Sequence, residues 1–302
     1  MREVRETAQA VALVEAMGAA CAAAGDAPPF NDQALVELRR GERRVVGDER
    51  ALAVIGGGEP RQTAPTEGEP AEGAAAQVEL PEVELAVHPQ HRGRGLGTAL
   101  VARLAEELGG FEAWAHGDHP AAAAIAAALP AERVRTLLQL RAPVPAAAAG
   151  DRLPGGVRAF EPEDASALLS LNAAAFASHP EQGRMSAADL ADRRAEGWHD
   201  DANLLVLPGD DGLDAFTWVK PDPAEPEIAE LYVLGVSPSR QGAGLGRTML
   251  DATFARMRAL GATTAHLYVE GDNDPALALY RRAGFTRWAI DVRYRHAPFI
   301  RD

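Results

Sequence analysis

Residues 236–246 read Val236-Ser237-Pro238-Ser239-Arg240-Gln241-Gly242-Ala243-Gly244-Leu245-Gly246. The first half of the chain holds a second copy of the pattern, Val87-His88-Pro89-Gln90-His91-Arg92-Gly93-Arg94-Gly95-Leu96-Gly97. The copies start 236 − 87 = 149 residues apart, close to half of the 302-residue chain. A pattern that returns after half the chain indicates two tandem copies of one domain.

Each copy has the composition of a loop between a strand and a helix. A proline ends the apolar run before the glycines, as it does at the end of a strand. After the second copy, Leu250, Phe254 and Met257 recur at helical spacing, and Gly261 stands where a helix would end. After the first, a leucine recurs at every fourth position from Leu96 to Leu108. Backbone N–H groups and a helix N-terminus therefore meet at one point, which favours phosphate binding.

The spacing of these loops resembles the acetyl-CoA motif Arg/Gln-x-x-Gly-x-Gly/Ala of the GCN5-related N-acetyltransferase (GNAT) superfamily. Residues 92–97 and 241–246 carry the resemblance. A dinucleotide-binding Gly-x-Gly-x-x-Gly loop fits worse because neither copy has its spacing, and no Gly-Lys-Ser/Thr follows to make a Walker loop. The resemblance implies acetyl-CoA as co-substrate and no metal.

Composition limits the class of protein. The chain is 47% hydrophobic and 25% charged, which is normal for globular domains, and its length suits two separate cores. No apolar run reaches the roughly 18 residues of a membrane helix, and the N-terminal residues do not form the apolar segment of a secretory signal. The single cysteine, Cys21, excludes an internal disulfide. The net charge of −14 disfavours a nucleic-acid partner. We therefore expect a cytoplasmic protein without a membrane or nucleic-acid partner, a monomer that contains an internal pseudo-dimer.

Strands alternate with helices in both halves, which predicts an α/β (α+β) fold with a mixed sheet in each half. The predicted domains are 1–141 and 156–302, joined by a Pro- and Ala-rich linker at 142–155, and residues 56–77 read as a mobile insert. Helices are predicted at 7–24, 32–40, 119–129, 162–175, 186–197 and 275–283. Strands are predicted at 43–46, 51–55, 82–87, 111–115, 134–140, 203–207, 213–219, 227–236, 264–269 and 285–295.

The two halves differ around the predicted strand 227–236. Strict alternation puts Glu230, Tyr232, Leu234 and Val236 on one face of this strand. Moving back by 149 residues, the partner of Glu230 is Pro81, and the nearby Glu82 and Glu84 point to the opposite face. Tyr280 in the predicted helix 275–283 corresponds to Ala126, or to Ile125 with a one-residue gap. The alignment therefore predicts that the first half lacks a carboxylate at the position of Glu230 and a phenol at the position of Tyr280.

Acetyl transfer to an amine needs two proton movements. The ammonium must lose a proton before it attacks the thioester, and the leaving thiolate benefits from a proton donor. Glu230 is a candidate base and Tyr280 a candidate acid. The backbone N–H groups near Leu234 to Val236 are candidates for stabilising the oxyanion. Glu230 as a solvated strand residue and Tyr280 as a core residue are the alternatives.

Longer strings extend the resemblance. His179-Pro180-Glu181-Gln182-Gly183, Glu230 to Val236 and Tyr268 to Asn273 resemble the mycothiol synthase family of actinobacterial acetyltransferases. The run from Asn273 to Phe285 also resembles the GNAT segment Asn-x-x-Ala-x-x-x-Tyr-x-x-x-Gly-Phe. Such enzymes acetylate the cysteinyl amine of a cysteine–glucosamine–inositol conjugate, desacetylmycothiol. The resemblance implies that the second half is active and that the first is a degenerate copy that can still hold acetyl-CoA.

Site residues follow from this resemblance, position by position. It implies that Glu230 is the general base and Tyr280 the general acid. The implied acetyl-CoA contacts of the second half are Leu234, Gly235, Val236, Gln241, Gly242, Ala243, Gly244, Leu245, Gly246, Arg247, Asn273, Asp274, Pro275, Ala276, Leu277 and Ala278. Those of the first half are Leu85, Ala86, Val87, Gly93, Arg94, Gly95, Leu96, Gly97 and Thr98. The implied substrate contacts are Asp32, Glu181, Lys220, Glu230 and Tyr268.

Two other functions remain open at this point. One is acetylation of another small amine, such as an aminoglycoside or a polyamine, which the negative net charge would attract. The other is an acetyl-CoA sensor in which both halves only bind. The Glu230 and Tyr280 pair argues against the sensor, and the string at 179–183 argues against the other amines only through the resemblance.

Overall fold

The computed structural model describes residues 2–57, 80–129, 131–146, 152–177 and 180–296. The chain forms two compact units: unit 1 runs to Leu137 and resumes at Ile290, and unit 2 spans Leu138–Ala289. The boundaries fall inside two strands, β6 (Ala131–Pro143) and β12 (Thr286–His296), so each unit includes part of a strand from the other half. The predicted division at 1–141, 142–155 and 156–302 lacks this exchange, because a pattern locates a strand without showing which sheet it joins.

Unit 1 is a mixed sheet with helices on both faces. Its strands are β1 (Arg2–Val4), β2 (Arg44–Gly47), β3 (Ala51–Gly56), β4 (Glu82–Val87) and β5 (Phe111–His116), followed by the end of β12. β4 and β5 are parallel, whereas the other neighbours in this order are antiparallel. The helices are α1 (Thr7–Ala23), α2 (Asp32–Arg39), α3 (Leu96–Leu108) and α4 (Pro120–Ala128), and η1 (Pro89–His91) is a 3₁₀ turn.

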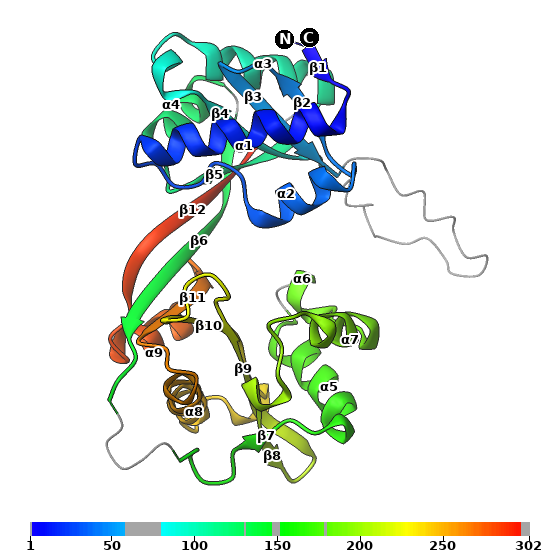
Figure 1. Cartoon of the computed structure of the whole chain (residues 1–302). Coiled ribbons are helices and arrows are strands. Elements are labelled where there is room, and N and C mark those ends of the chain that lie inside the picture. Colours follow the sequence, from blue (N-terminus) through cyan, green and yellow to red (C-terminus); the bar gives the residue numbers. More distant parts are fainter. Residues whose placement is uncertain (1, 58–79, 130, 147–151, 178–179, 297–302) are drawn as a thin grey trace, which may run out of the picture. The chain divides into compact units, whose positions relative to one another are not determined.

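The two faces of the unit 1 sheet carry separate cores. On one face, residues of α1 and α2 pack on Leu52, Val54 and Ala86. On the other, α3 packs on Val83 and Phe111 (Figure 1). Side chains of β4 therefore alternate between a face covered by α1 and α2 and a face covered by α3.

Unit 2 repeats this plan. The end of β6 precedes β11 (Thr264–Glu270), β10 (Ile228–Val236), β9 (Gly212–Pro221), β8 (Leu204–Gly209) and β7 (Arg158–Ala159) in its sheet. β10 and β11 are parallel, and β10–β9, β9–β8 and β8–β7 are antiparallel. The helices are α5 (Ala165–Ala175), α6 (Pro180–Gly183), α7 (Ala187–Ala195), α8 (Leu245–Ala259) and α9 (Asp274–Arg282), with 3₁₀ turns η2 (Pro162–Asp164), η3 (Asp201–Asn203) and η4 (Pro238–Arg240).

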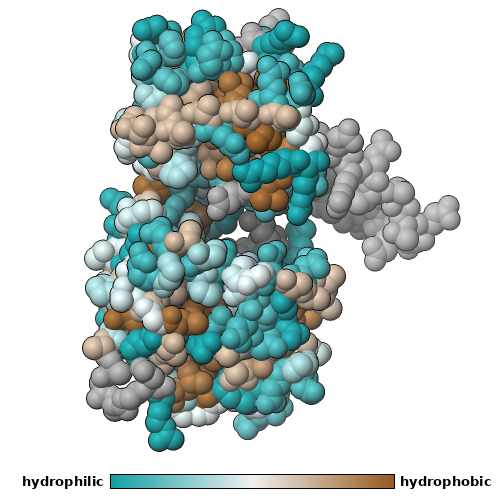
Figure 2. Space-filling view, viewed as in Figure 1, coloured by the Kyte–Doolittle hydropathy of each residue, from teal (hydrophilic) through white to brown (hydrophobic). Residues whose placement is uncertain are grey.

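The faces of the unit 2 sheet are also distinct. α8 and α9 cover Ala229, Leu231 and Leu267 on one face. α5 and α7 cover Trp218 and Val233 on the other (Figure 1). Hydrophilic side chains cover much of the visible surface of each unit, and hydrophobic side chains form small groups among these hydrophilic ones (Figure 2).

The α/β fold and almost all predicted elements are confirmed, with ends shifted by a few residues. The predicted helices at 7–24 and 32–40 are α1 and α2, and Asn31 caps α2 by accepting a 2.7 Å hydrogen bond from the backbone N–H of Ala34. β1 and the short α6 were not predicted. Most of the expected insert at 56–77 lies outside the described residues, as do residues 147–151 of the expected linker. Among the described helices, none has the length and apolarity to cross a membrane.

Candidate active site

Both glycine loops adopt the conformation that their sequences predict. Gly242 and Gly244 have φ values of +80° and +85°, and Gly93 and Gly95 have values of +69° and +75°. These left-handed conformations turn the chain from the 3₁₀ turn into the N-terminus of α8 or α3. The first N–H groups of a helix lack intrahelical acceptors, so each loop presents donors and the positive end of a helix dipole. This geometry fits an acetyl-CoA pyrophosphate.

The third glycine of each loop allows close helix packing. A Cβ at Gly246 would lie 3.3 Å from Leu279 on α9, and one at Gly97 would lie 3.0 Å from Ile125 on α4. The loop in the first half of the chain therefore matches the loop in the second half in three dimensions as well as in sequence.

In both units, two parallel strands separate beside the loop. β10 pairs with β11 only over Ile228–Glu230, although β10 continues to Val236 along its other neighbour, β9. β4 likewise pairs with β5 only over Glu82–Glu84 and continues to Val87. The β10 edge beyond Glu230 therefore has no β11 partner, as expected for a strand that offers N–H groups to a ligand. Glu230 is the last paired residue before the strands separate.

A β-bulge corrects the predicted faces of β10. The register with β9 shifts between Leu231, which pairs with Val219, and Val233, which pairs with Trp218. Tyr232 packs with the α5–α7 core, whereas Leu234 and Val236 pack with α8. The prediction that all four side chains from Glu230 to Val236 share one face is wrong, because one extra residue reverses the alternation.

The bulge also corrects the comparison of the two halves. Glu82 pairs with Gly56 and Glu112, and Glu230 pairs with Lys220 and His266. Glu112 and His266 both lie five residues before the Gly-Asp pair that ends their strands. Glu82 is therefore the counterpart of Glu230, and the predicted partner, Pro81, is wrong. Glu82 and Glu84 lie on the face covered by α1 and α2, which corresponds to the face of Glu230.

The environment of Glu230 suits a general base. It is half-buried on β10, and burial raises the pKa of its carboxyl, an effect that Lys220 opposes and Asp222 reinforces. Among the described residues, no donor or cation bonds directly to this carboxylate. A carboxylate with a raised pKa and no ion-pair partner is more basic than a solvated one.

Lys220 lies beside an aromatic cluster on the same face. Its ammonium is 5.5 Å from the ring centre of Trp198 and 5.7 Å from that of Tyr232. Arg193 donates a 3.2 Å hydrogen bond to the Tyr232 hydroxyl, which fixes that ring. Lys220 thus lies near two aromatic rings and directly opposite Glu230 on the neighbouring strand. Both residues are among the substrate contacts that the sequence resemblance implies.

Tyr280 occupies a different environment. It is buried in the core beneath α8 and α9, with its ring 5.6 Å from that of Phe285. Burial raises the pKa of its hydroxyl well above the ordinary value, so it stays protonated at neutral pH. It belongs to the α8–α9 core, on the face of the sheet opposite Glu230. The phenol is therefore suited to donate a proton.

The other residues that the sequence resemblance implies as acetyl-CoA or substrate contacts lie in several different environments. Asn273 caps α9 by accepting a 3.1 Å hydrogen bond from the Ala276 N–H, and Leu277 is a core residue. Arg247 is exposed and pairs with Asp251 one turn later. The side chains of Asp32 and Glu181 lie outside the described part of the structure. Within the described residues, no cluster of three His, Cys, Asp or Glu side chains is placed to hold a metal ion.

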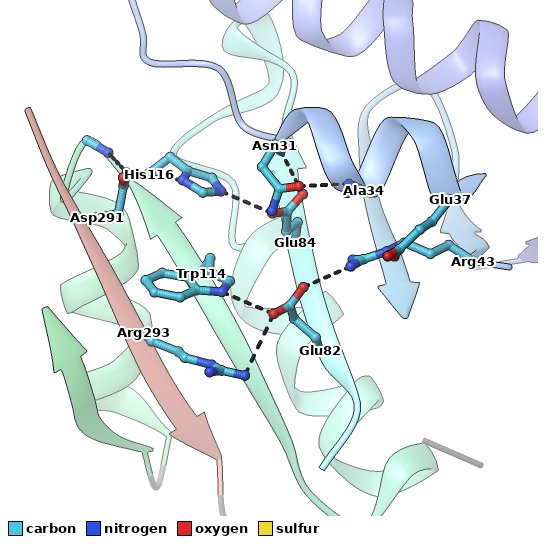
Figure 3. A network of polar contacts seen from close by, with 11 residues as sticks. Asn31, Ala34, Glu37, Arg43, Glu82, Glu84, Trp114, His116, Asp291 and Arg293 are labelled. Atoms are coloured by element: carbon cyan, nitrogen blue, oxygen red, sulfur yellow. Dashed lines mark hydrogen bonds and ion pairs between the residues drawn. The ribbon is translucent and has the colours of Figure 1, made fainter. Parts of the chain in front are cut away.

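In unit 1, the face that corresponds to the Glu230 face is filled by a polar network (Figure 3). Glu82 accepts from Arg43 at 2.9 Å and from the Trp114 indole at 3.2 Å, and it lies 3.7 Å from Arg293. Glu84 is fully buried and bonds to Asn31 and His116. The Glu82 and Glu84 carboxylates are thus both engaged by neighbouring groups.

Sequence reasoning missed three residues close to the site. His266 is the β11 partner of Glu230, and its ring lies 4.9 Å from Tyr268 and 5.7 Å from Trp288. The Arg141 guanidinium stacks on Trp288 at 3.7 Å from the ring centre. The one sequence signal for His266 was its spacing of two residues from Tyr268, which places both side chains on one face of a strand. No local sequence pattern indicates that Arg141 on β6 and Trp288 on β12 are in contact.

The profile of the Acetyltransferase (GNAT) family matches residues 41–128 and 170–285, one segment in each half. A mycothiol acetyltransferase of Clavibacter sepedonicus is 51% identical over 224 residues, 72% of this chain and 73% of that protein. A mycothiol acetyltransferase of Thermobispora bispora is 40% identical over 301 residues, 97% of this chain and 98% of that protein. The similarity therefore runs through both halves.

Solved structures show the same fold. A GCN5-related N-acetyltransferase from Sphaerobacter thermophilus aligns with a TM-score of 0.69 over 97% of this chain and 95% of its own, at 19% identity. A tandem GNAT protein from the clavulanic acid biosynthesis pathway aligns with a TM-score of 0.65 over 98% and 97%, also at 19% identity. At these identities the likeness concerns the tandem fold alone.

Proposed function

Since the chain belongs to the GNAT acetyltransferase family, we propose that its second half transfers the acetyl group of acetyl-CoA to the cysteinyl amine of the cysteine–glucosamine–inositol conjugate, forming mycothiol. The names of its relatives suggest this acceptor. The observation that carries the chemistry is Glu230, a half-buried carboxylate that no described residue ion-pairs, at the point where β10 and β11 separate.

The reaction follows from this geometry. Glu230 takes a proton from the acceptor ammonium, directly or through water, and the free amine nitrogen attacks the thioester carbonyl carbon. Backbone N–H groups near Leu234 on the β11 side of β10, where the two strands no longer pair, stabilise the resulting oxyanion. The carbon–sulfur bond then breaks, and Tyr280 gives its proton to the departing thiolate. The products are the amide, CoA and one proton: Glu230 releases the first ammonium proton to solvent, and the amide nitrogen loses its second proton through solvent, which restores the proton of Tyr280.

The glycine loop of α8 holds the acetyl-CoA pyrophosphate through its backbone N–H groups. Gly93 to Thr98 form the corresponding loop of α3, and we infer that it holds a second acetyl-CoA without turnover. The reason for this difference is electrostatic: Arg43, Trp114 and Arg293 engage Glu82, whereas no described residue bonds to the Glu230 carboxylate. The Glu82 oxygens that would have to accept a proton from an ammonium are thus already occupied by other donors.

One assay tests both acceptor and base. Release of the CoA thiol is followed for the full chain with acetyl-CoA and with the conjugate, cysteine, an aminoglycoside or a polyamine. We expect the highest kcat/KM for the conjugate. Glu230→Gln should lower kcat by about 10²–10⁴-fold, and the matched variant Glu82→Gln should not. A preference for a polyamine or aminoglycoside would overturn the acceptor, and equal loss in both variants would overturn the assignment of the base.

A further inference from the structure

Next to Glu230, unit 2 carries an aromatic and cationic strip formed by the exposed rings of Trp288 and Tyr268 together with Arg141 and the buried His266. Trp288 and Tyr268 are 56% and 45% exposed, and they are two of the three large hydrophobic side chains that the described surface exposes. Exposed indole faces are costly in water and are typical of ligand contacts. The strip is therefore a candidate binding surface in its own right.

Two polar atoms of this strip are buried without partners. Nε of Arg141 and Nε2 of His266 make no hydrogen bond to any described residue. A buried polar atom without a partner costs about 1–3 kcal/mol, so such atoms are rare unless a ligand or water satisfies them. Arg141 also has no carboxylate partner within the described residues and stacks on the Trp288 ring at 3.7 Å.

The charges of the strip select the ligand. His266 is neutral, because burial and the nearby Arg141 lower the pKa of its imidazole to about 4. The strip thus combines a flat apolar face, a fixed guanidinium donor and an uncharged ring nitrogen. Rings that carry many hydroxyls fit this combination: their C–H face stacks on an indole, and their hydroxyls exchange hydrogen bonds with Arg141 and His266.

We infer that Trp288, Arg141 and His266 form the subsite for the hydroxylated rings of the acceptor, with the indole of Trp288 as its floor. This inference rests on the proposed function, because it takes the glucosamine–inositol part of the conjugate as the occupant. His266 is the register neighbour of Glu230, so a ring on this strip leaves the cysteinyl amine of the same molecule near the base. The subsite thereby determines which amines are acetylated efficiently.

The kinetic test compares two acceptors in three variants. For Trp288→Leu and Arg141→Met, we expect KM for the conjugate to rise about tenfold, the loss of one desolvated cation–π or stacking contact. Their kcat, their KM for acetyl-CoA and their rate with cysteine amide, which lacks the rings, should change less than twofold. Arg135→Met is the matched control, because Arg135 lies over Trp114 at 5.6 Å in unit 1. An unchanged KM for the conjugate in both Trp288→Leu and Arg141→Met would overturn the subsite.

A binding test separates this inference from the proposed function. Calorimetry with free glucosamine–inositol needs no turnover, and we expect wild type to bind it and Trp288→Leu to bind it at least tenfold more weakly. If wild type binds the rings in this way but acetylates no conjugate, the subsite stands and the proposed function fails. If wild type acetylates the conjugate but Trp288→Leu and Arg141→Met bind the rings like wild type, the function stands and the subsite fails. Circular dichroism melts of each variant exclude unfolding as the cause.

Discussion

His116 joins two carboxylates of unit 1 and offers a quantitative test of the structure. Its Nε2 lies 3.1 Å from Oε1 of the fully buried Glu84, and its Nδ1 lies 3.0 Å from Oδ1 of Asp291 on β12 (Figure 3). Burial alone would lower the pKa of the imidazole, but the hydrogen bonds to Asp291 and Glu84 outweigh it and raise the pKa to about 9. The folded state therefore holds this histidine as a cation.

The sign and size of the effect on stability follow from that pKa. Because the folded pKa lies above the ordinary value of 6.5, the contribution is fully present below pH 6.5 and is lost as pH rises through about 9. A difference of about 2.5 pH units corresponds to roughly 3 kcal/mol at 1.36 kcal/mol per unit. Only 15% of the His116 side chain is exposed, so solvent screening reduces this figure little.

Hydrogen exchange in the full chain measures this contribution locally. The opening free energy of peptides from β5 and from the Ile290–His296 part of β12 should fall by about 3 kcal/mol between pH 6 and pH 9.5 in wild type. In His116→Gln it should be lower at pH 6 and nearly constant over the same range. His91→Gln, which changes a histidine outside the network, should keep the wild-type slope.

The reasoning is refuted by either of two results. One is a wild-type opening free energy that varies by less than about 1 kcal/mol over this range. The other is a His116→Gln variant with the wild-type slope, since another group would then be titrating. Asp291→Asn should reduce the slope as well, because it removes one of the two acceptors of the imidazolium.

Three further predictions concern the candidate active site. Tyr280→Phe should lower kcat less than Glu230→Gln does, because a CoA thiolate is a fair leaving group, with thiol release at saturating acetyl-CoA as the measurement. Gly244→Val places a β-branched residue at φ +85° and should abolish turnover, whereas Gly95→Val at φ +75° should remove one acetyl-CoA site in calorimetry and leave kcat intact. Asn273→Ala removes the cap of α9 and should lower the unfolding free energy of unit 2 by about 1 kcal/mol in thermal melts.

Local patterns predicted most of the fold because they have local causes. The leucines from Leu96 to Leu108 face one core, and Gly109 ends the helix with a φ of +68°, so composition and structure agree there. The glycine loops were predictable for the same reason. Each needs positive φ values at two positions that few other residues tolerate.

Non-local pairing set the limit of the sequence analysis. The bulge at Tyr232 depends on how β10 meets β9, and alternation along one strand contains no information about its neighbour. This single residue inverted the expected faces and concealed Glu82 as the counterpart of Glu230. The strip around Trp288 was missed because Arg141 and His266 come from distant strands.

The neighbours of the equivalent glutamates explain how one fold supports two different carboxylates. Glu82 stands beside Glu112, and two adjacent carboxylates require cations. Arg293 meets that requirement, since its Nε lies 2.7 Å from Glu112 and its terminal nitrogen 3.7 Å from Glu82. In unit 2 the position of Glu112 is taken by the neutral His266, and no arginine among the described residues pairs with Glu230. Together with Arg43, which lies 2.9 Å from Glu82, the residue opposite the glutamate thus contributes to whether the carboxylate is held in ion pairs or left available as a base.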